Sequence, residues 1–191
     1  MKLIYLIGAP GSGKTTLTQN LQQDWQLTGR QTQPFKHETY ELPNGLTATN
    51  LGHNAPPFGG TDTLPYNAID TILKELPNIT TDIIYGEGDR LANERFLTEA
   101  ANYAETFVFY LNTSPSVAAD RRLSRSIAND LKQQNISWVT GRATKHLNLA
   151  NRFNAVNLDG RLPIQQLCEI IWDTVNRTTD TGSGRPSTEG E

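Results

Sequence analysis

Cysteine and histidine are scarce in this sequence, which excludes several kinds of site. Cys168 is the single cysteine among 191 residues, so the chain can form neither an internal disulfide framework nor a cysteine-based zinc site. The three histidines, His37, His53 and His146, lack the spacing of zinc ligands. A chain without disulfides is typical of a reducing compartment, and we therefore expect a cytoplasmic protein.

Long hydrophobic runs and a large excess of one charge are also missing. No stretch approaches the roughly 20 apolar residues of a membrane-spanning helix, and the apolar run at residues 3–7 is too short for a secretion signal. We therefore expect no membrane partner. The net charge is −3 and the pI is about 5.6, so the molecule as a whole is not a basic nucleic-acid coat. A local basic face remains compatible with these values.

Short apolar runs alternate along the chain with amphipathic helical patterns. The strand-like runs cover residues 3–7, 82–85, 107–111 and 155–158, and the helical patterns cover residues 14–27, 69–76, 91–103, 115 onward, 143–153 and 164–175. Between them, residues 35–42 and 46–51 flank Pro43-Asn44-Gly45, which predicts a hairpin or two short strands. This alternation predicts a three-layer α/β fold with a mostly parallel central sheet flanked by helices.

The length and the composition at the carboxyl end predict the domain organisation. A chain of 191 residues suits one domain with one core, and we place it at residues 1–176. Residues 177–191 are polar, contain glycine, serine, threonine and proline, and show no periodicity. We expect them to form a disordered tail. The sequence does not indicate an oligomeric state.

The segment Gly8–Thr15 matches the phosphate-binding pattern G-x-x-x-x-G-K-[ST] at every fixed position, between a predicted strand and a predicted helix. Glycines let backbone N–H groups turn toward an anion, and the helix N-terminus adds partial positive charge. We therefore expect ATP with Mg²⁺ as cofactors, Lys14 at the transferred phosphates as a catalytic residue, and Thr15 as a metal ligand. The expected ATP-binding residues are Gly8, Gly11, Ser12, Gly13, Lys14, Thr15 and Thr16.

An acidic segment follows the predicted strand at residues 82–85, where ligands of such sheets bind. A carboxylate beside bound phosphate can accept the proton of an acceptor hydroxyl or hold Mg²⁺ through water. Glu87 is the first candidate for either role, and Asp89 is the second. The sequence leaves open which of Glu87, Asp89 and Asp62 is the catalytic base. Arg90 is expected to bind substrate phosphate. A solvated turn is the alternative interpretation of this segment.

Three arginines, Arg121, Arg122 and Arg125, lie in the predicted helix that follows Ser114. Arg121 and Arg125 are separated by four residues and therefore share one helix face. A solvent-exposed basic face is one interpretation of this spacing. The other is a set of catalytic arginines that closes over bound phosphates.

The chain resembles the nucleoside and nucleotide kinase group of P-loop proteins over most of residues 1–176. It lacks the Asn-Lys-x-Asp segment with which GTPases read guanine. In this kinase group an acid followed by an arginine occupies the place of residues 87–90, and arginines of a lid neutralise charge that develops on the phosphates. The resemblance implies an ATP-dependent phosphotransferase in which Arg121 and Arg125 are catalytic lid residues.

The loop at residues 51–64 is the expected acceptor-binding segment. It is long, rich in glycine and proline, and carries an acid, hydroxyls and an aromatic ring, as functional loops often do. Phe58 could stack on a base, and Asp62 could bind a hydroxyl or a ring N–H. With Thr61 and Arg90 these are the expected substrate-binding residues. A purely structural Ω-loop is the alternative.

Residues 121–152 carry seven basic side chains against Asp130 alone, a net charge of +6, which leaves −9 for the rest of the chain. Such a segment suits ATP and also a nucleic-acid backbone. The segments at 59–62, 86–90 and 141–145 resemble viral P-loop kinases that phosphorylate the hydroxymethyl group of 5-hydroxymethyluracil in DNA. This resemblance implies DNA as a partner and the host cytoplasm as the location.

Three functions remain open from the sequence. The first is a kinase acting on a nucleotide-like hydroxyl, which includes the hydroxymethyl group of 5-hydroxymethyluracil in DNA. The second is a nucleoside monophosphate or small-metabolite kinase. The third, from another class, is an ATP-binding switch protein without kinase activity. The basic segment favours the first function over the second.

Overall fold

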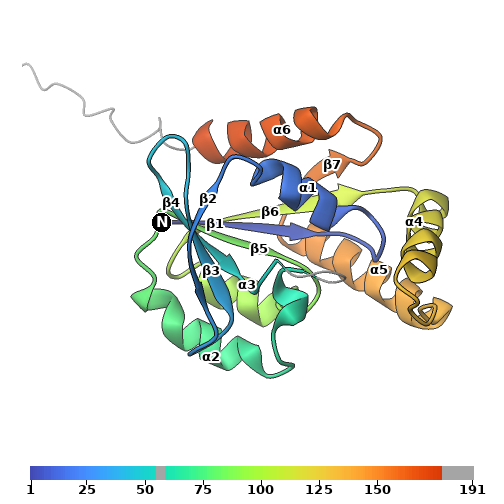
Figure 1. Cartoon of the computed structure of the whole chain (residues 1–191), viewed down its shortest axis with the longest axis horizontal. Coiled ribbons are helices and arrows are strands. Elements are labelled where there is room, and N and C mark those ends of the chain that lie inside the picture. The colour runs from blue at the N-terminus through green and yellow to red at the C-terminus, as the bar shows by residue number, and fades with distance from the viewer. Residues whose placement is uncertain (55–58, 178–191) are drawn as a thin grey trace, which may run out of the picture.

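The described residues, 1–54 and 59–177 of a computed structural model, form a seven-stranded sheet in the order β2-β3-β4-β5-β1-β6-β7 (Figure 1). The strands are β1 (Lys2–Ile7), β2 (Gln26–Gln31), β3 (His37–Glu41), β4 (Thr47–Leu51), β5 (Ile83–Glu87), β6 (Glu105–Asn112) and β7 (Val156–Asp159). From β4 to β7 all neighbours are parallel, whereas β2 and β3 join the sheet by antiparallel pairing. The sheet is therefore mostly parallel, as the alternating pattern predicted.

Helices cover both faces of the sheet (Figure 1). They are α1 (Lys14–Leu21), α2 (Ala68–Glu75), α3 (Glu94–Ala100), α4 (Pro115–Ala128), α5 (Ile136–Arg152) and α6 (Ile164–Arg177), with two short 3-10 turns, η1 (Thr61–Thr63) and η2 (Leu76–Asn78). Because side chains alternate along a strand, Leu3 and Tyr5 of β1 pack under α2 and α3, whereas Ile4 and Leu6 pack under α1 and α6. This arrangement confirms the predicted three-layer α/β fold.

The segment after the phosphate loop differs from the predicted helix at residues 14–27. Helix α1 ends at Leu21, and Gln26–Gln31 forms the edge strand β2, which the sequence analysis did not predict. Trp25 fits the helical spacing of Leu17 and Leu21 only by coincidence, because it reaches the same apolar cluster from the turn that follows the helix. Its ring centre lies 5.8 Å from that of Tyr40.

Other boundaries shift in both directions. Helix α5 begins at Ile136, seven residues before the predicted start at 143, because Asn135 caps it by accepting hydrogen bonds from the N–H groups of Ser137 and Trp138. Helix α6 continues through Arg177, the first residue assigned to the tail. Residues 178–191 lie outside the described residues, so the tail remains a prediction. No helix in the described part of the chain is long and apolar enough to cross a membrane.

The carboxyl ends of β1 and β5 lie side by side, because Leu6 pairs with Glu87 in the parallel register. The loop from residue 8 therefore starts beside Glu87. The segment that follows β4 approaches the same edge, where Gly52 lies against Gly60 in a contact that leaves no space for a side chain. A Cβ atom on Gly52 would lie 1.9 Å from the carbonyl oxygen of Gly60.

Gly52→Ala should destabilise the protein more than Gly45→Ala. Both glycines have positive φ angles, 94° and 80°, so both substitutions introduce backbone strain of about 1 kcal/mol. Only Gly52 also has a backbone atom in the way, since nothing lies within 4 Å of a Cβ atom at Gly45. Urea unfolding of the two variants measures the difference, and equal losses of unfolding free energy would contradict the close contact.

Candidate active site

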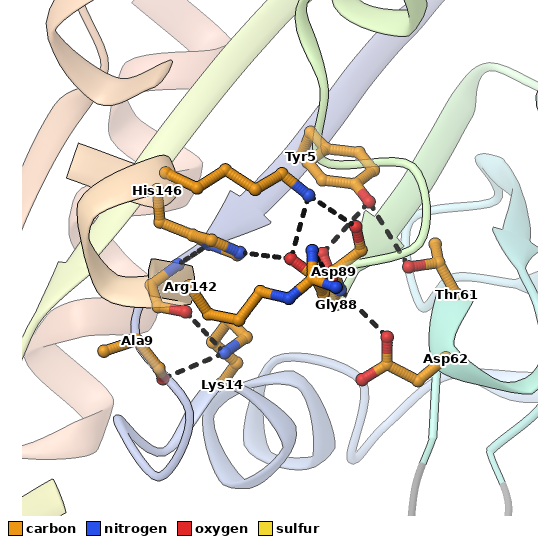
Figure 2. Close-up of polar contacts among 11 residues, drawn as sticks. Tyr5, Ala9, Lys14, Thr61, Asp62, Gly88, Asp89, Arg142 and His146 are labelled. Atoms are coloured by element: carbon orange, nitrogen blue, oxygen red, sulfur yellow. Dashed lines mark hydrogen bonds and ion pairs between the residues drawn. The ribbon is translucent and has the colours of Figure 1, made fainter. Parts of the chain in front are cut away.

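The phosphate loop connects β1 to α1 and has the backbone of an anion cradle. Gly11 and Gly13 adopt φ angles of 84° and 104°, which side chains other than glycine rarely tolerate. The ammonium of Lys14 folds back over the loop and donates hydrogen bonds to the carbonyl oxygens of Gly8 at 2.8 Å and Ala9 at 3.2 Å (Figure 2). Burial lowers the pKa of Lys14, and the nearby carboxylate of Glu87 partly offsets this effect.

Helix α4 packs directly on this loop. A Cβ atom on Gly11 would lie 2.3 Å from the carbonyl oxygen of Ala118, so the helix backbone and the loop are in close contact. Arg121 donates to the carbonyl oxygen of Ser12 at 2.8 Å, and Arg122 donates to that of Pro10 at 2.9 Å. The predicted arginine helix therefore lies against the phosphate loop, although two of its arginines hold loop carbonyls.

A polar cavity of about 330 Å³ opens above the loop. It is lined by side chains from the phosphate loop, β5, α4, α5 and the segment before α2, among them Lys14, Thr15, Asp62, Glu87, Arg125 and Trp138. Thr16 and Arg121 also line it. Most of the residues predicted for ATP binding and catalysis thus surround one volume.

Glu87 is the buried acid of this cavity. Glu87 is 3% exposed, and its Oε1 accepts a hydrogen bond from the Thr15 hydroxyl at 3.1 Å. Burial raises the pKa of Glu87 to about 7, and the nearby ammonium of Lys14 works in the opposite direction. A carboxyl with this pKa can exchange a proton near neutral pH.

The oxygens of Thr15 and Glu87 fit the predicted magnesium site. Mg²⁺ prefers oxygen ligands and is commonly held by one or two protein groups together with substrate phosphates. Two such oxygens lie 3.1 Å apart beside the phosphate loop. Among the described residues no group of three or more histidine, cysteine or acidic side chains could hold a metal by itself, so the remaining ligands would come from ATP and water.

Asp89 is held by three side chains of α5. Arg142 donates to Oδ2 at 2.8 Å, whereas Lys145 and His146 both donate to Oδ1 at 2.9 Å (Figure 2). Partial burial opposes ionisation, but the bonds from His146 and Lys145 outweigh it and hold the pKa of Asp89 well below its usual range. Asp89 is therefore a weak base and is poorly suited to accept the proton of an acceptor hydroxyl.

His146 was considered in the sequence only as a possible zinc ligand. The structure places its ring, 1% exposed, between the phosphate loop and Asp89. Burial lowers the pKa of His146, which favours the neutral imidazole, and the nearby Asp89 works in the opposite direction. The spacing of Arg142, Lys145 and His146 is i, i+3, i+4, which places them on one helix face. That spacing was readable in the sequence, but their common partner was not.

The predicted acceptor-binding residues separate into different positions. Asp62 lines the cavity and accepts a hydrogen bond from the backbone N–H of Asp89 at 2.9 Å. Thr61 is fully buried, and its hydroxyl lies 3.3 Å from that of Tyr5 (Figure 2). Arg90 stacks on the exposed ring of Tyr66, with 3.7 Å from its guanidinium carbon to the ring centre. Phe58 lies outside the described residues.

The fold and the site together define a P-loop kinase, a class of phosphotransferases. Residues 1–166 match the family described as P-loop Nucleotide Kinase3, and the chain belongs to that family. No curated protein matches the chain.

Solved kinases share the fold at low sequence identity. A gluconokinase from Sinorhizobium meliloti 1021 is 12% identical, with 93% of each chain covered and a TM-score of 0.55. Shikimate kinase from Aquifex aeolicus vf5 is 14% identical over 94% of this chain and 99% of that chain, with a TM-score of 0.52. Deoxyadenosine kinase from M. mycoides is 14% identical over 92% and 99%, with a TM-score of 0.50.

Glu87→Gln should change how the free energy of unfolding depends on pH. In the nucleotide-free protein the raised pKa means that the folded state keeps a proton that the unfolded state releases between about pH 4.5 and 7. Wild-type stability should therefore fall, relative to the variant, by about 3 kcal/mol across this range and then level off. Urea titrations at several pH values test this prediction. If the unfolding free energies of the wild type and the variant change with pH in parallel, burial does not raise the pKa of Glu87.

Proposed function

We propose that the protein transfers the γ-phosphate of ATP to a hydroxyl of a small, nucleotide-like acceptor, with Glu87 as the base. The observation that carries this proposal is the buried carboxyl of Glu87, 3.1 Å from the Thr15 hydroxyl at the end of the phosphate loop. A base in this place lies beside the position of the transferred phosphate. Asp89, held by three donors, is proposed to organise the site.

The proposed reaction follows from the side chains around the cavity. The acceptor oxygen forms a bond to the γ-phosphorus as the bond to the β–γ bridging oxygen breaks, which leaves ADP. The carboxylate of Glu87 takes the hydroxyl proton. Lys14, Arg121 and Arg125 line the cavity. Lys14 and Arg125 would neutralise the charge of the transferred group, and Arg121, which also donates to the Ser12 carbonyl, would contribute from the edge of the loop. Thr15, together with Glu87 through a water molecule, would hold Mg²⁺ beside the phosphates, and the ion would add further positive charge there.

The contacts of the basic segment support a small acceptor over DNA. Several basic side chains in residues 121–152 bind carbonyl or carboxylate groups within the protein, among them Arg121, Arg122, Arg142, Lys145 and Arg152. Because these side chains hold the phosphate loop, Asp89 and Glu94, much of the positive charge of the segment is already paired within the protein. The similar structures are likewise named as kinases of gluconate, shikimate and deoxyadenosine.

Asp62 is the residue that we propose for acceptor recognition. Its Oδ1 accepts the Asp89 N–H, and its side chain lines the cavity, so the carboxylate can accept a hydrogen bond from an acceptor hydroxyl or ring N–H. Thr61 and Arg90 would act indirectly, by holding the segments on which Asp62 and Asp89 lie. The stacking role of Phe58 stays a prediction.

Transfer of labelled γ-phosphate tests the proposed function. The panel contains nucleosides, nucleoside monophosphates, gluconate, shikimate and DNA with 5-hydroxymethyluracil. We expect label in a free small acceptor, and Glu87→Gln should lower the rate of transfer by about 10²-fold or more while Mg·ADP still binds. Label only in the DNA would show a polymer-level base kinase, and ATP hydrolysis that no acceptor stimulates would contradict the proposal.

Arg125→Ala should lower kcat by about 10²-fold, because a cation that stabilises transferred charge acts mainly in the transition state. Arg95→Ala is the matched control, since Arg95 lies on α3 and forms surface pairs with Asp70 and Glu99. Steady-state kinetics with the best acceptor of the panel compare the two variants. If kcat of Arg125→Ala equals that of the control, Arg125 has no role in catalysis.

A further inference from the structure

His146 joins two parts of the active site that are far apart in the sequence. Its Nδ1 accepts the backbone N–H of Gly8, the first residue of the phosphate loop, at 2.9 Å. Since Nδ1 is an acceptor, the proton of the neutral ring is on Nε2, which donates to Oδ1 of Asp89 at 2.9 Å. One imidazole thus satisfies a buried donor and a carboxylate at opposite ends.

Asp89 in turn contacts Asp62 and two basic side chains of α5. Its backbone N–H donates a hydrogen bond to Asp62, and its carboxylate forms ion pairs with Arg142 and Lys145 of α5 (Figure 2). Through His146 these groups are linked to the loop that cradles phosphate. A shift of Gly8 would therefore be transmitted through the imidazole ring to its bond with Asp89.

We propose that His146 is a positioning residue that couples nucleotide binding at the phosphate loop to the placement of α5 and Asp89. Its two nitrogens have separate tasks. The Nδ1 end sets the backbone of Gly8 and so the affinity for nucleotide, and the Nε2 end holds α5 on Asp89. The inference rests on nucleotide binding by the phosphate loop and does not depend on the identity of the acceptor.

A purely structural role would not need an imidazole at this position. The buried face of α5 also contains Leu149 and Ala150, which are apolar and pack in the core. A leucine in place of His146 would fill a similar volume but leave the Gly8 N–H without a partner, which is costly for a buried donor. His146 uses one acceptor and one donor in this place, which a side chain that only filled the space would not need.

Asparagine and glutamine separate the two ends of the ring. The amide oxygen of asparagine can replace Nδ1 as an acceptor for Gly8, whereas the longer glutamine can present its amide N–H₂ near the position of Nε2. His146→Asn thus keeps the bond to the phosphate loop, His146→Gln keeps the bond to Asp89, and His146→Leu removes both. His37→Asn, at a half-buried histidine of β3 outside the cavity, is the matched control.

Two measurements without an acceptor test the proposal: the affinity for Mg·ADP by calorimetry, and amide hydrogen exchange of residues 136–152. We expect His146→Gln to weaken Mg·ADP binding about tenfold and leave α5 protected, and His146→Asn to speed exchange in α5 about tenfold and leave the affinity unchanged. His146→Leu should show both effects. Mg·ADP should slow exchange in α5 of the wild type but not of His146→Leu.

Equal effects of the asparagine and glutamine variants on both measurements would overturn the proposal, because they would show a residue that only fills space. Wild-type values for all three variants would also overturn it. Circular dichroism checks that each variant folds. If the leucine variant does not fold, the comparison of the asparagine and glutamine variants still tests the proposal. A failed phosphate transfer assay would contradict the proposed function but leave these two measurements interpretable.

Discussion

The parallel pairing of β1 with β5 is the constraint on which the active site depends. The register of Leu6 with Glu87 makes both strands end at the same level, so the phosphate loop and the acidic segment start side by side. Close packing maintains this level: a Cβ atom on Gly86 would lie 2.6 Å from the ring of Tyr5. The hydroxyl of the same tyrosine donates to the carbonyl oxygen of Gly88 at 3.2 Å. A shift of either strand would separate Glu87 from the phosphate loop.

Burial gives the two acids of the site different chemistry. Glu87 has one hydroxyl donor and a nearby ammonium, which do not offset its loss of water, so its pKa rises to about 7. Asp89 has three donors from α5, of which His146 and Lys145 outweigh its desolvation and lower its pKa. Two carboxylates only two residues apart are therefore suited to different tasks, proton transfer and organisation of the site.

The parts of the structure that could be predicted from the sequence depend on local patterns. The Gly8–Thr15 motif, the apolar strands and the proline after Ser114 are short-range signals, and the structure confirms the elements that they predict. Strand β2 was missed because its residues are polar and exposed at the sheet edge. The bond between His146 and Asp89 joins residues 57 positions apart, and the packing of α5 against β6 brings them together.

The central claim is that Glu87 contacts the reacting oxygen when phosphate is transferred. A crystal structure with Mg·ADP and aluminium fluoride, which imitates the transferred phosphate, tests this claim most directly. The account predicts the fluoride group between Lys14, Arg125 and Glu87, with a carboxylate oxygen of Glu87 about 3 Å from the apical oxygen in line with ADP. A fluoride group bound away from Glu87, with another residue or no residue at the apical oxygen, would contradict it.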